Sequence, residues 1–294
     1  MNVITRSIDR YSGFALNALK EAWAYRFRLL IWIVYDFVML AVQYYLWTAV
    51  FANSGGSLRG ISALQYISYV AIVMVVSRLI ACRIDGDIAE QIKDGNISMN
   101  LTKPFSYFGM MLSRRIGFSL SDTLALLPIA VVASFMVGTL ASNPLVLAAF
   151  VLSLFFGYVL TTITFFLLGI LAFWITNYWG LFLFKGHIIA LFSGEIVALD
   201  LLFRLGSGSI PELPIPFLNG ETVGAILRGF GIAAYCLPFQ AMTYTPSAIL
   251  TGMISEPRAI LLHLLLQIGW IAVMAGITRF AWLRGLRRVT IMGG

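Results

Sequence analysis

The sequence predicts an all-α integral membrane protein, and three features of the chain carry that prediction. Of its 294 residues, 60% are hydrophobic and 11% are charged, whereas soluble proteins carry about 25% charged residues. The mean hydropathy is +0.90. Long apolar stretches alternate with short polar ones, and a helical span needs about 20 apolar residues. We therefore expect six transmembrane helices within a single domain of residues 1–294.

Six apolar stretches are expected to cross the membrane, in chain order. They lie at 29–51, 63–82, 116–140, 145–175, 187–203 and 259–282. Gly/Ser-rich or Pro-containing turns separate several of them, and the fourth is long enough to tilt or to protrude.

An amphipathic helix is predicted over residues 5–24, before the first span. Tyr11, Phe14 and Ala18 follow helical spacing, while Arg10 and Lys20 fall on other faces. Such a helix can lie in the headgroup plane with its aromatic side down. A cap packed on another domain is the alternative.

Residues 204–257 differ in character because they hold six of the nine prolines. The apolar run 223–235 is too short to cross comfortably and contains Arg228. We expect short helices that dip into the membrane or rest on its surface, with a break at Leu237-Pro238-Phe239.

The placement of Lys and Arg predicts the orientation. With the N-terminus inside, only Arg59, Arg204, Arg228 and Arg258 lie in outer segments, and the other 16 of the 20 basic residues lie in inner ones. Such a bias marks the cytoplasmic side. We expect both termini and residues 84–105 in the cytoplasm. Because the basic residues cluster at span ends, the net charge of +7 does not indicate nucleic-acid binding.

The segment 84–105 is the longest strongly polar run in the chain. Ile84, Ile88 and Ile92 are four residues apart, so they line one side of a short helix. The segment is predicted to contact something outside the membrane. A solvated loop that merely connects two spans is the alternative.

The ends of this short helix also carry signals. Asp85 or Asp87 can cap its start, because a carboxylate accepts from the unpaired backbone N–H groups there. Gly95 suits the residue just past its end, where the backbone is left-handed. Apolar residues then alternate with polar ones up to Lys103-Pro104, at Ile97, Met99 and Leu101.

No grouping of residues predicts catalysis or a bound cofactor. His187 and His263 lie on different spans with no ligand at metal-binding spacing, and no Gly-x-x-x-x-Gly-Lys-Ser/Thr phosphate loop is present. A membrane enzyme that acts on lipid is disfavoured for the same reason.

Four carboxylates fall within the expected spans, at Asp36, Asp122 and Glu195 and, near the end of the fifth, at Asp200. A charge at bilayer depth is costly and is by default a functional hypothesis. Arg78 is expected to pair with Asp36, and Arg114 or Arg115 with Asp122, which would make both carboxylates structural. Glu195 can line a polar cavity or a re-entrant turn. The alternative is an ion-coupled secondary transporter that uses these groups as ion sites.

The ordered motifs of the chain resemble the six-span permease subunits of type-two ABC exporters, in particular a small bacterial subfamily of stand-alone permeases. The motifs that carry the resemblance are Asp87-Ile88, Lys93-Asp94-Gly95-Asn96-Ile97, Leu101-Thr102-Lys103-Pro104, Phe192-Ser193-Gly194, Leu237-Pro238-Phe239, Tyr244-x-Pro246 with Gly252, and the terminal Arg287-Arg288 followed by Gly293-Gly294.

This resemblance implies a part for each region. The N-terminal helix would lie on the inner leaflet, and the short helices before the last span would lie in the outer leaflet. Residues 84–105 would form a coupling helix that docks on a separate ATPase. Its coupling residues would be Asp87, Ile88, Glu90, Gln91, Lys93, Asp94, Gly95, Lys103 and Pro104.

The resemblance also implies an assembly in the cell membrane. Two permeases, identical chains or paralogues, would join two cytoplasmic ATPase subunits that bind the ATP. The chain itself would have no catalysis and no cofactor. It would move a hydrophobic or amphipathic substrate, such as a drug, a peptide or a lipid-like molecule, outward across the membrane.

Overall fold

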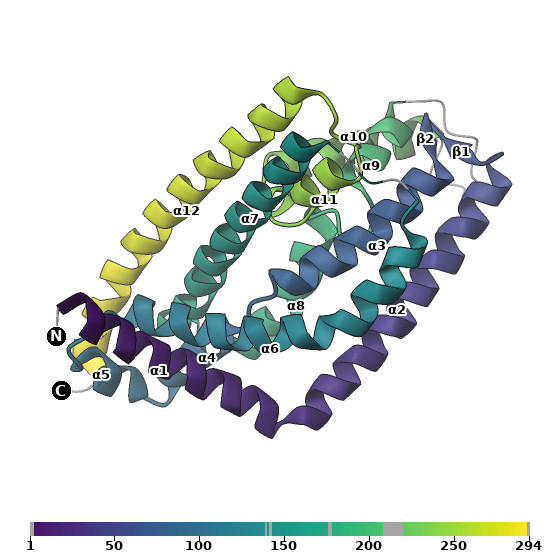
Figure 1. Cartoon of the computed structure of the whole chain (residues 1–294). Coiled ribbons are helices and arrows are strands. Elements are labelled where there is room, and N and C mark those ends of the chain that lie inside the picture. Colours follow the sequence, from purple (N-terminus) through teal and green to yellow (C-terminus); the bar gives the residue numbers. More distant parts are fainter. Residues whose placement is uncertain (1–2, 139, 141–142, 176–177, 208–219, 293–294) are drawn as a thin grey trace.

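The computed structural model confirms the all-α fold (Figure 1). It describes residues 3–292 except 139, 141–142, 176–177 and 208–219. The helices are α1 (Val3–Ala24), α2 (Arg26–Asn53), α3 (Ala63–Leu79), α4 (Ile84–Lys93), α5 (Asn96–Leu101), α6 (Tyr107–Met136), α7 (Pro144–Ile170), η1 (Leu171–Phe173), α8 (Tyr178–Phe192), α9 (Leu199–Gly206), α10 (Gly220–Tyr235), η2 (Pro238–Ala241), α11 (Tyr244–Leu250) and α12 (Pro257–Met292). A small antiparallel hairpin, β1 (Ser57–Leu58) with β2 (Ile61–Ser62), joins α2 to α3.

Side-chain caps fix the starts of three long helices. Ser62 accepts from a backbone N–H at the start of α3, and Ser106 does the same for α6. Asn143 caps α7, with Pro144 at the first helical position. These residues satisfy donors that a helix start leaves unpaired, and proline there has no N–H to lose.

Five helical stretches among the described residues are long and apolar enough to cross a bilayer. They lie in α2, in α3 continued by α4, in α6, in α7 with η1, and in α12. The expected fifth span, 187–203, is not one helix: α8 ends at Phe192, and α9 starts only at Leu199. The chain turns at Ser193 and Gly194, and composition did not predict this turn because the residues on both sides of it are mostly apolar. With 15 residues, α8 is shorter than the other candidates.

The apolar stripe of α1 packs on α6. Ala18 and Ala22 are 0% and 2% exposed, the Phe14 ring meets Phe105 at 5.2 Å, and the Ser106 N–H donates to the Tyr11 hydroxyl at 3.2 Å. The expectation that this stripe faces lipid was therefore wrong. Small residues let α1 approach the neighbouring helix closely, and protein covers the face.

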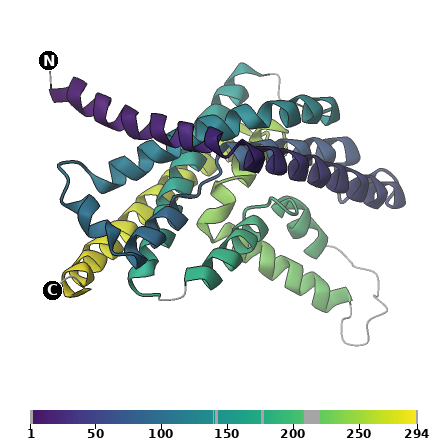
Figure 2. The same ribbon diagram turned by 90° about the horizontal axis from the view of Figure 1, so that it is seen from below.

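The two ends of the molecule differ, and we name them for what lies there. The hairpin end holds β1–β2, α9 and α10. The α4 end holds α4, α5, the start of α1 and the end of α12 (Figure 1). Seen from below, α1 and α10 lie on opposite sides of the central helices (Figure 2).

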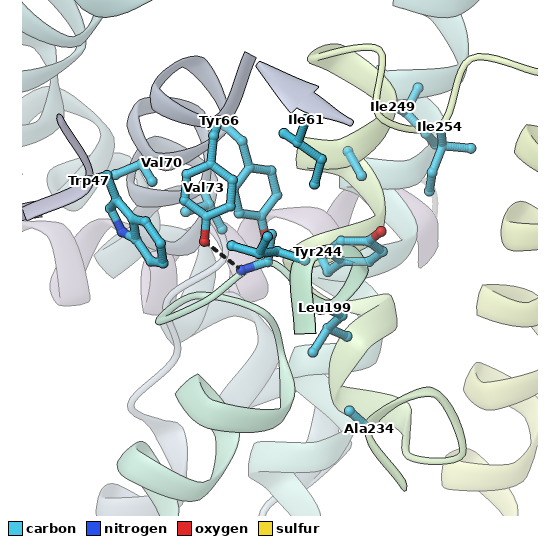
Figure 3. Close-up of a cluster of buried hydrophobic side chains, with 14 of the residues drawn as sticks. Trp47, Ile61, Tyr66, Val70, Val73, Leu199, Ala234, Tyr244, Ile249 and Ile254 are labelled. Atoms are coloured by element: carbon cyan, nitrogen blue, oxygen red, sulfur yellow. Dashed lines mark hydrogen bonds between the residues drawn. The ribbon is translucent and has the colours of Figure 1, made fainter. Parts of the chain in front are cut away.

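The core toward the hairpin end is aromatic and holds the turn after α8 in place. Tyr66 on α3 accepts from the Ala198 N–H at 3.2 Å (Figure 3), and the Tyr69 hydroxyl donates to the Gly194 carbonyl at 2.6 Å. Tyr244 packs in the same cluster. The chain breaks at Leu237, where η2 begins with Pro238, as predicted. The prolines at 211, 214 and 216 lie outside the described residues.

Candidate functional site: the α4–α5 segment

The apolar face of α4 is seated on the protein itself. Ile84, Ile88 and Ile92 are 2%, 0% and 9% exposed, and they pack with the end of α7 and the start of α6. The four-residue spacing therefore predicted the buried face correctly. Burying such side chains stabilises the position of α4 by about 1.5–3 kcal/mol each.

Gly169 in α7 allows α4 to lie directly on that helix. A Cβ atom at this position would come within 2.8 Å of the Ile88 Cβ and 2.9 Å of the Asp85 Cα. Neither neighbour is the flexible end of a side chain, so a larger residue would push the two helices apart. The backbones of α4 and α7 therefore lie directly against each other, which leaves little room for α4 to move on α7.

A buried ion pair ties the start of α4 to α8. The Asp85 carboxylate accepts from the Lys185 ammonium and from the Tyr178 hydroxyl. The side chain of Asp85 is 0% exposed and that of Lys185 is 8% exposed. The expected cap by Asp85 or Asp87 was wrong, because Arg83 is the residue before the helix and no side chain caps it. Asp85 is used for tertiary contact instead.

Asp87 and Gln91 also turn toward the protein. Arg114 on α6 donates to Asp87 at 3.2 Å and to Glu21 on α1 at 3.1 Å, so one guanidinium links three helices. The Gln91 side-chain oxygen accepts from the Tyr107 hydroxyl at 3.1 Å. These contacts fix α4 against rotation about its own axis.

The outward surface of the segment is polar. The exposed residues predicted for coupling are Glu90, Lys93, Asp94, Gly95, Lys103 and Pro104. Gly95 has a φ of +74° just past the end of α4, as predicted. The residues after it form the short helix α5, although apolar and polar residues alternate along 97–101. Ile97 is 2% exposed, whereas Met99 is 61% exposed and sequence reasoning had not assigned it to the coupling surface.

The carboxylates Asp36 and Asp122 belong to one cluster of two ion pairs. Arg78 pairs with Asp36, as predicted. Asp122 pairs with Arg83 at 3.7 Å, and not with Arg114 or Arg115 as expected. The Trp32 ring lies 4.9 Å from the guanidinium carbon of Arg78 and 5.6 Å from that of Arg83. Each carboxylate therefore has a cationic partner.

Arg115 is unavailable to Asp122 because it is buried elsewhere. It is 1% exposed, and it donates to the backbone oxygens of Ile80 at 2.7 Å and Tyr158 at 3.0 Å. Its guanidinium carbon lies 3.8 Å from the centre of the Tyr158 ring. Arg115 thus joins the end of α3 to α6 and α7.

Glu195 lies in the turn between α8 and α9, half-buried. Ser77 and Arg78 on α3 are polar residues in its surroundings. A turn was one of the two alternatives for Glu195, and a polar cavity was the other; the described residues have a turn here, within the expected fifth span. Within the described ranges, no group of three or more His, Cys, Asp or Glu residues could hold a metal ion.

Sequence reasoning missed three residues of this site: Lys185, Tyr178 and Arg83. Lys185 did carry a signal, since it is the only Lys or Arg between Arg115 and Arg204. A lone cation in such an apolar stretch needs a partner. Its partner Asp85 is 100 positions away, so local spacing did not identify it.

The fold and the site define a multi-pass α-helical membrane protein with a rigidly seated polar segment between its second and third apolar stretches. Residues 37–218 match the family model described as ABC-2 family transporter protein. The match spans more than half of the chain, which therefore belongs to that family. The resemblance drawn from the motifs is confirmed at this level. The search of curated proteins gives no match.

Membership defines the class of activity. Members of this family are membrane components of ABC transporters, systems in which an ATPase partner supplies the energy. The chain is thus a permease of this type and a membrane transport component.

Proposed function

We propose that this chain is the permease subunit of an ATP-driven exporter. Its α4–α5 segment docks on a separate cytoplasmic ATPase dimer, which binds the ATP. A second permease, an identical chain or a paralogue, completes the transporter, and the cargo is a hydrophobic or amphipathic molecule moved outward. No cofactor is assigned to the permease itself.

The observation that carries this proposal is the way α4 is held. Its inner side is fixed by the apolar seat, by the Asp85–Lys185 pair and by Arg114, while Glu90 and Lys93 point outward. A helix that cannot roll or bend transmits a push as a rigid body. A solvated connector would not need buried attachments to α6, α7 and α8.

The proposed orientation puts the α4 end in the cytoplasm. The outer arginines gather at the other end: Arg204 donates to the Arg59 carbonyl at 3.2 Å, and Arg228 lies against Gly206. Both the start of α1 and the end of α12 lie at the α4 end (Figure 1). This agrees with an even number of crossings, with α8 as the short fifth one.

Labelling of single cysteines tests the orientation. Ser57 and Asn96 are both exposed and lie at opposite ends of the molecule, so each can be replaced by Cys after the exposed Cys236 is changed to Ser. An impermeant maleimide should modify Ser57→Cys in intact cells, and Asn96→Cys only after permeabilisation. The reverse pattern would invert the orientation.

A charge exchange tests the docking surface. In the double variant Glu90→Lys/Lys93→Glu, composition and net charge stay the same, and both side chains are exposed, so folding and yield should not change. A like-charge contact at an interface costs several kcal/mol. We therefore expect the ATPase that co-purifies with the chain to fall at least about tenfold.

The matched control is Lys20→Glu, an exposed charge reversal on α1, which should leave ATPase recovery unchanged. If the double variant recovers the ATPase normally and shows normal substrate-stimulated hydrolysis, this face of α4 does not dock on the ATPase.

A further inference from the structure

A groove of about 630 Å³ opens between α6, α7 and α12 at the α4 end. Its walls are largely apolar and aromatic, with Phe108, Phe166 and Trp282 among them. The rings of Tyr107 and Trp282 are stacked, with centres 5.3 Å apart and an angle of 10° between them. This volume lies in the range of small-molecule sites, about 300–1,000 Å³.

One cation stands at the rim of the groove. Arg279 lines it and is exposed, and it forms no ion pair with any acidic residue in the part of the chain that the structure describes. Two other arginines at this end are engaged: Arg114 bonds to two carboxylates, and Arg288 donates to the Phe173 carbonyl. The groove therefore combines apolar walls with one uncompensated positive charge.

The length of α12 places Arg279 at the edge of the hydrocarbon layer. At 1.5 Å per residue, the 36 residues of α12 span about 54 Å, well beyond the hydrocarbon thickness of about 30 Å. Arg279 lies about 33 Å along the helix from Pro257. Trp282 follows one turn later, at the depth where Trp and Tyr concentrate.

We propose that this groove binds one anionic phospholipid, with an acyl chain between the aromatic walls and the headgroup phosphate at Arg279. Apolar walls below a cation are complementary to an acyl chain below a phosphate, and basic pockets between membrane helices hold anionic headgroups in this way. The lipid would also contact Leu101 of α5 and Tyr107, whose hydroxyl bonds to Gln91 of α4. The site thus adjoins the α4–α5 segment.

Lipid retention by the purified chain tests the site. The chain in detergent is titrated with phosphatidylglycerol or with phosphatidylcholine, and bound lipid is counted by native mass spectrometry. We expect one phosphatidylglycerol held more tightly than phosphatidylcholine. Arg279→Gln should weaken the binding of phosphatidylglycerol about fivefold, as expected for one basic group near an anionic lipid. The binding of phosphatidylcholine should not change.

Two further variants make the test specific. Arg284→Gln removes a second exposed arginine of α12 that does not line the groove, and it should change nothing. Ala275→Phe fills the groove without altering its charge, and it should weaken the binding of both lipids.

The proposal is overturned if Arg279→Gln and Arg284→Gln behave alike, or if Ala275→Phe retains lipid normally. It is also overturned if Ala275→Phe changes the oligomeric mass of the chain instead of its lipid content, since a second copy would then be the occupant. Retention by the isolated chain requires no ATPase, so this result is independent of the docking test.

Discussion

Replacing Asp85 by Leu is expected to destabilise the protein by about 3–5 kcal/mol, because the change removes the carboxylate that pairs with the buried Lys185 ammonium. The side chain of Lys185 is only 8% exposed. Lys185→Met should cost a similar amount, since it strands a carboxylate that is fully buried. Denaturant unfolding in mixed micelles, followed by Trp fluorescence, measures both effects.

The double variant Asp85→Leu/Lys185→Met shows whether the lost stability comes from leaving one charge of the pair without the other. Replacing a whole buried pair by apolar residues is often neutral or stabilising, so most of the lost stability should return. The coupling energy of the cycle is then large. Single variants as stable as the parent would show that this pair does not hold α4 to α8.

The sequence predicted the structure correctly where the prediction depended on residues close together along one helix. Ile84, Ile88 and Ile92 are four apart, and the structure buries all three. Hydropathy located the long helices because each must be apolar over its own length. These are local properties, so they can be read from consecutive residues.

Contacts between distant residues did not follow from the same reasoning. Asp122 was matched with Arg114 or Arg115 because they precede it on the same helix. Seven residues along a helix separate two Cα atoms by about 10 Å, and the actual partner, Arg83, lies in the connection between α3 and α4. Asp85 likewise meets Lys185 only because side chains of α8 reach the start of α4 in the folded chain.

Composition alone also misjudged how continuous some elements are. Residues 187–203 are apolar enough for one span, yet the chain turns at Gly194 because Tyr69 of α3 binds its carbonyl oxygen. Tertiary contact overrode local hydropathy there. The same holds for α1, whose apolar stripe was assigned to lipid but packs on α6.

Ile88→Pro should have the greatest effect on coupling, because it interrupts α4 in the middle. Proline within a helix costs about 3 kcal/mol or more, and Ile88 is fully buried over Gly169. Ile88 lies in α4, beyond the end of α3 at Leu79, so we expect the chain to insert and to lose order locally around residues 84–101. Limited proteolysis of membranes should then cut this segment, which stays protected in the parent.

Comparing Ile88→Pro with Ile88→Ala shows whether α4 transmits force as a rigid helix or only provides a surface that the ATPase contacts. Ile88→Ala removes buried carbon, at a cost of about 2–5 kcal/mol, but it leaves the backbone of α4 able to form its hydrogen bonds. If α4 acts as a lever on the ATPase, the alanine variant should retain substrate-stimulated hydrolysis in whatever complex assembles. The proline variant should fail to co-purify with the ATPase or should bind it without stimulation. A proline variant that transports normally would mean that α4 only connects two spans, because a broken helix cannot transmit a rigid-body push.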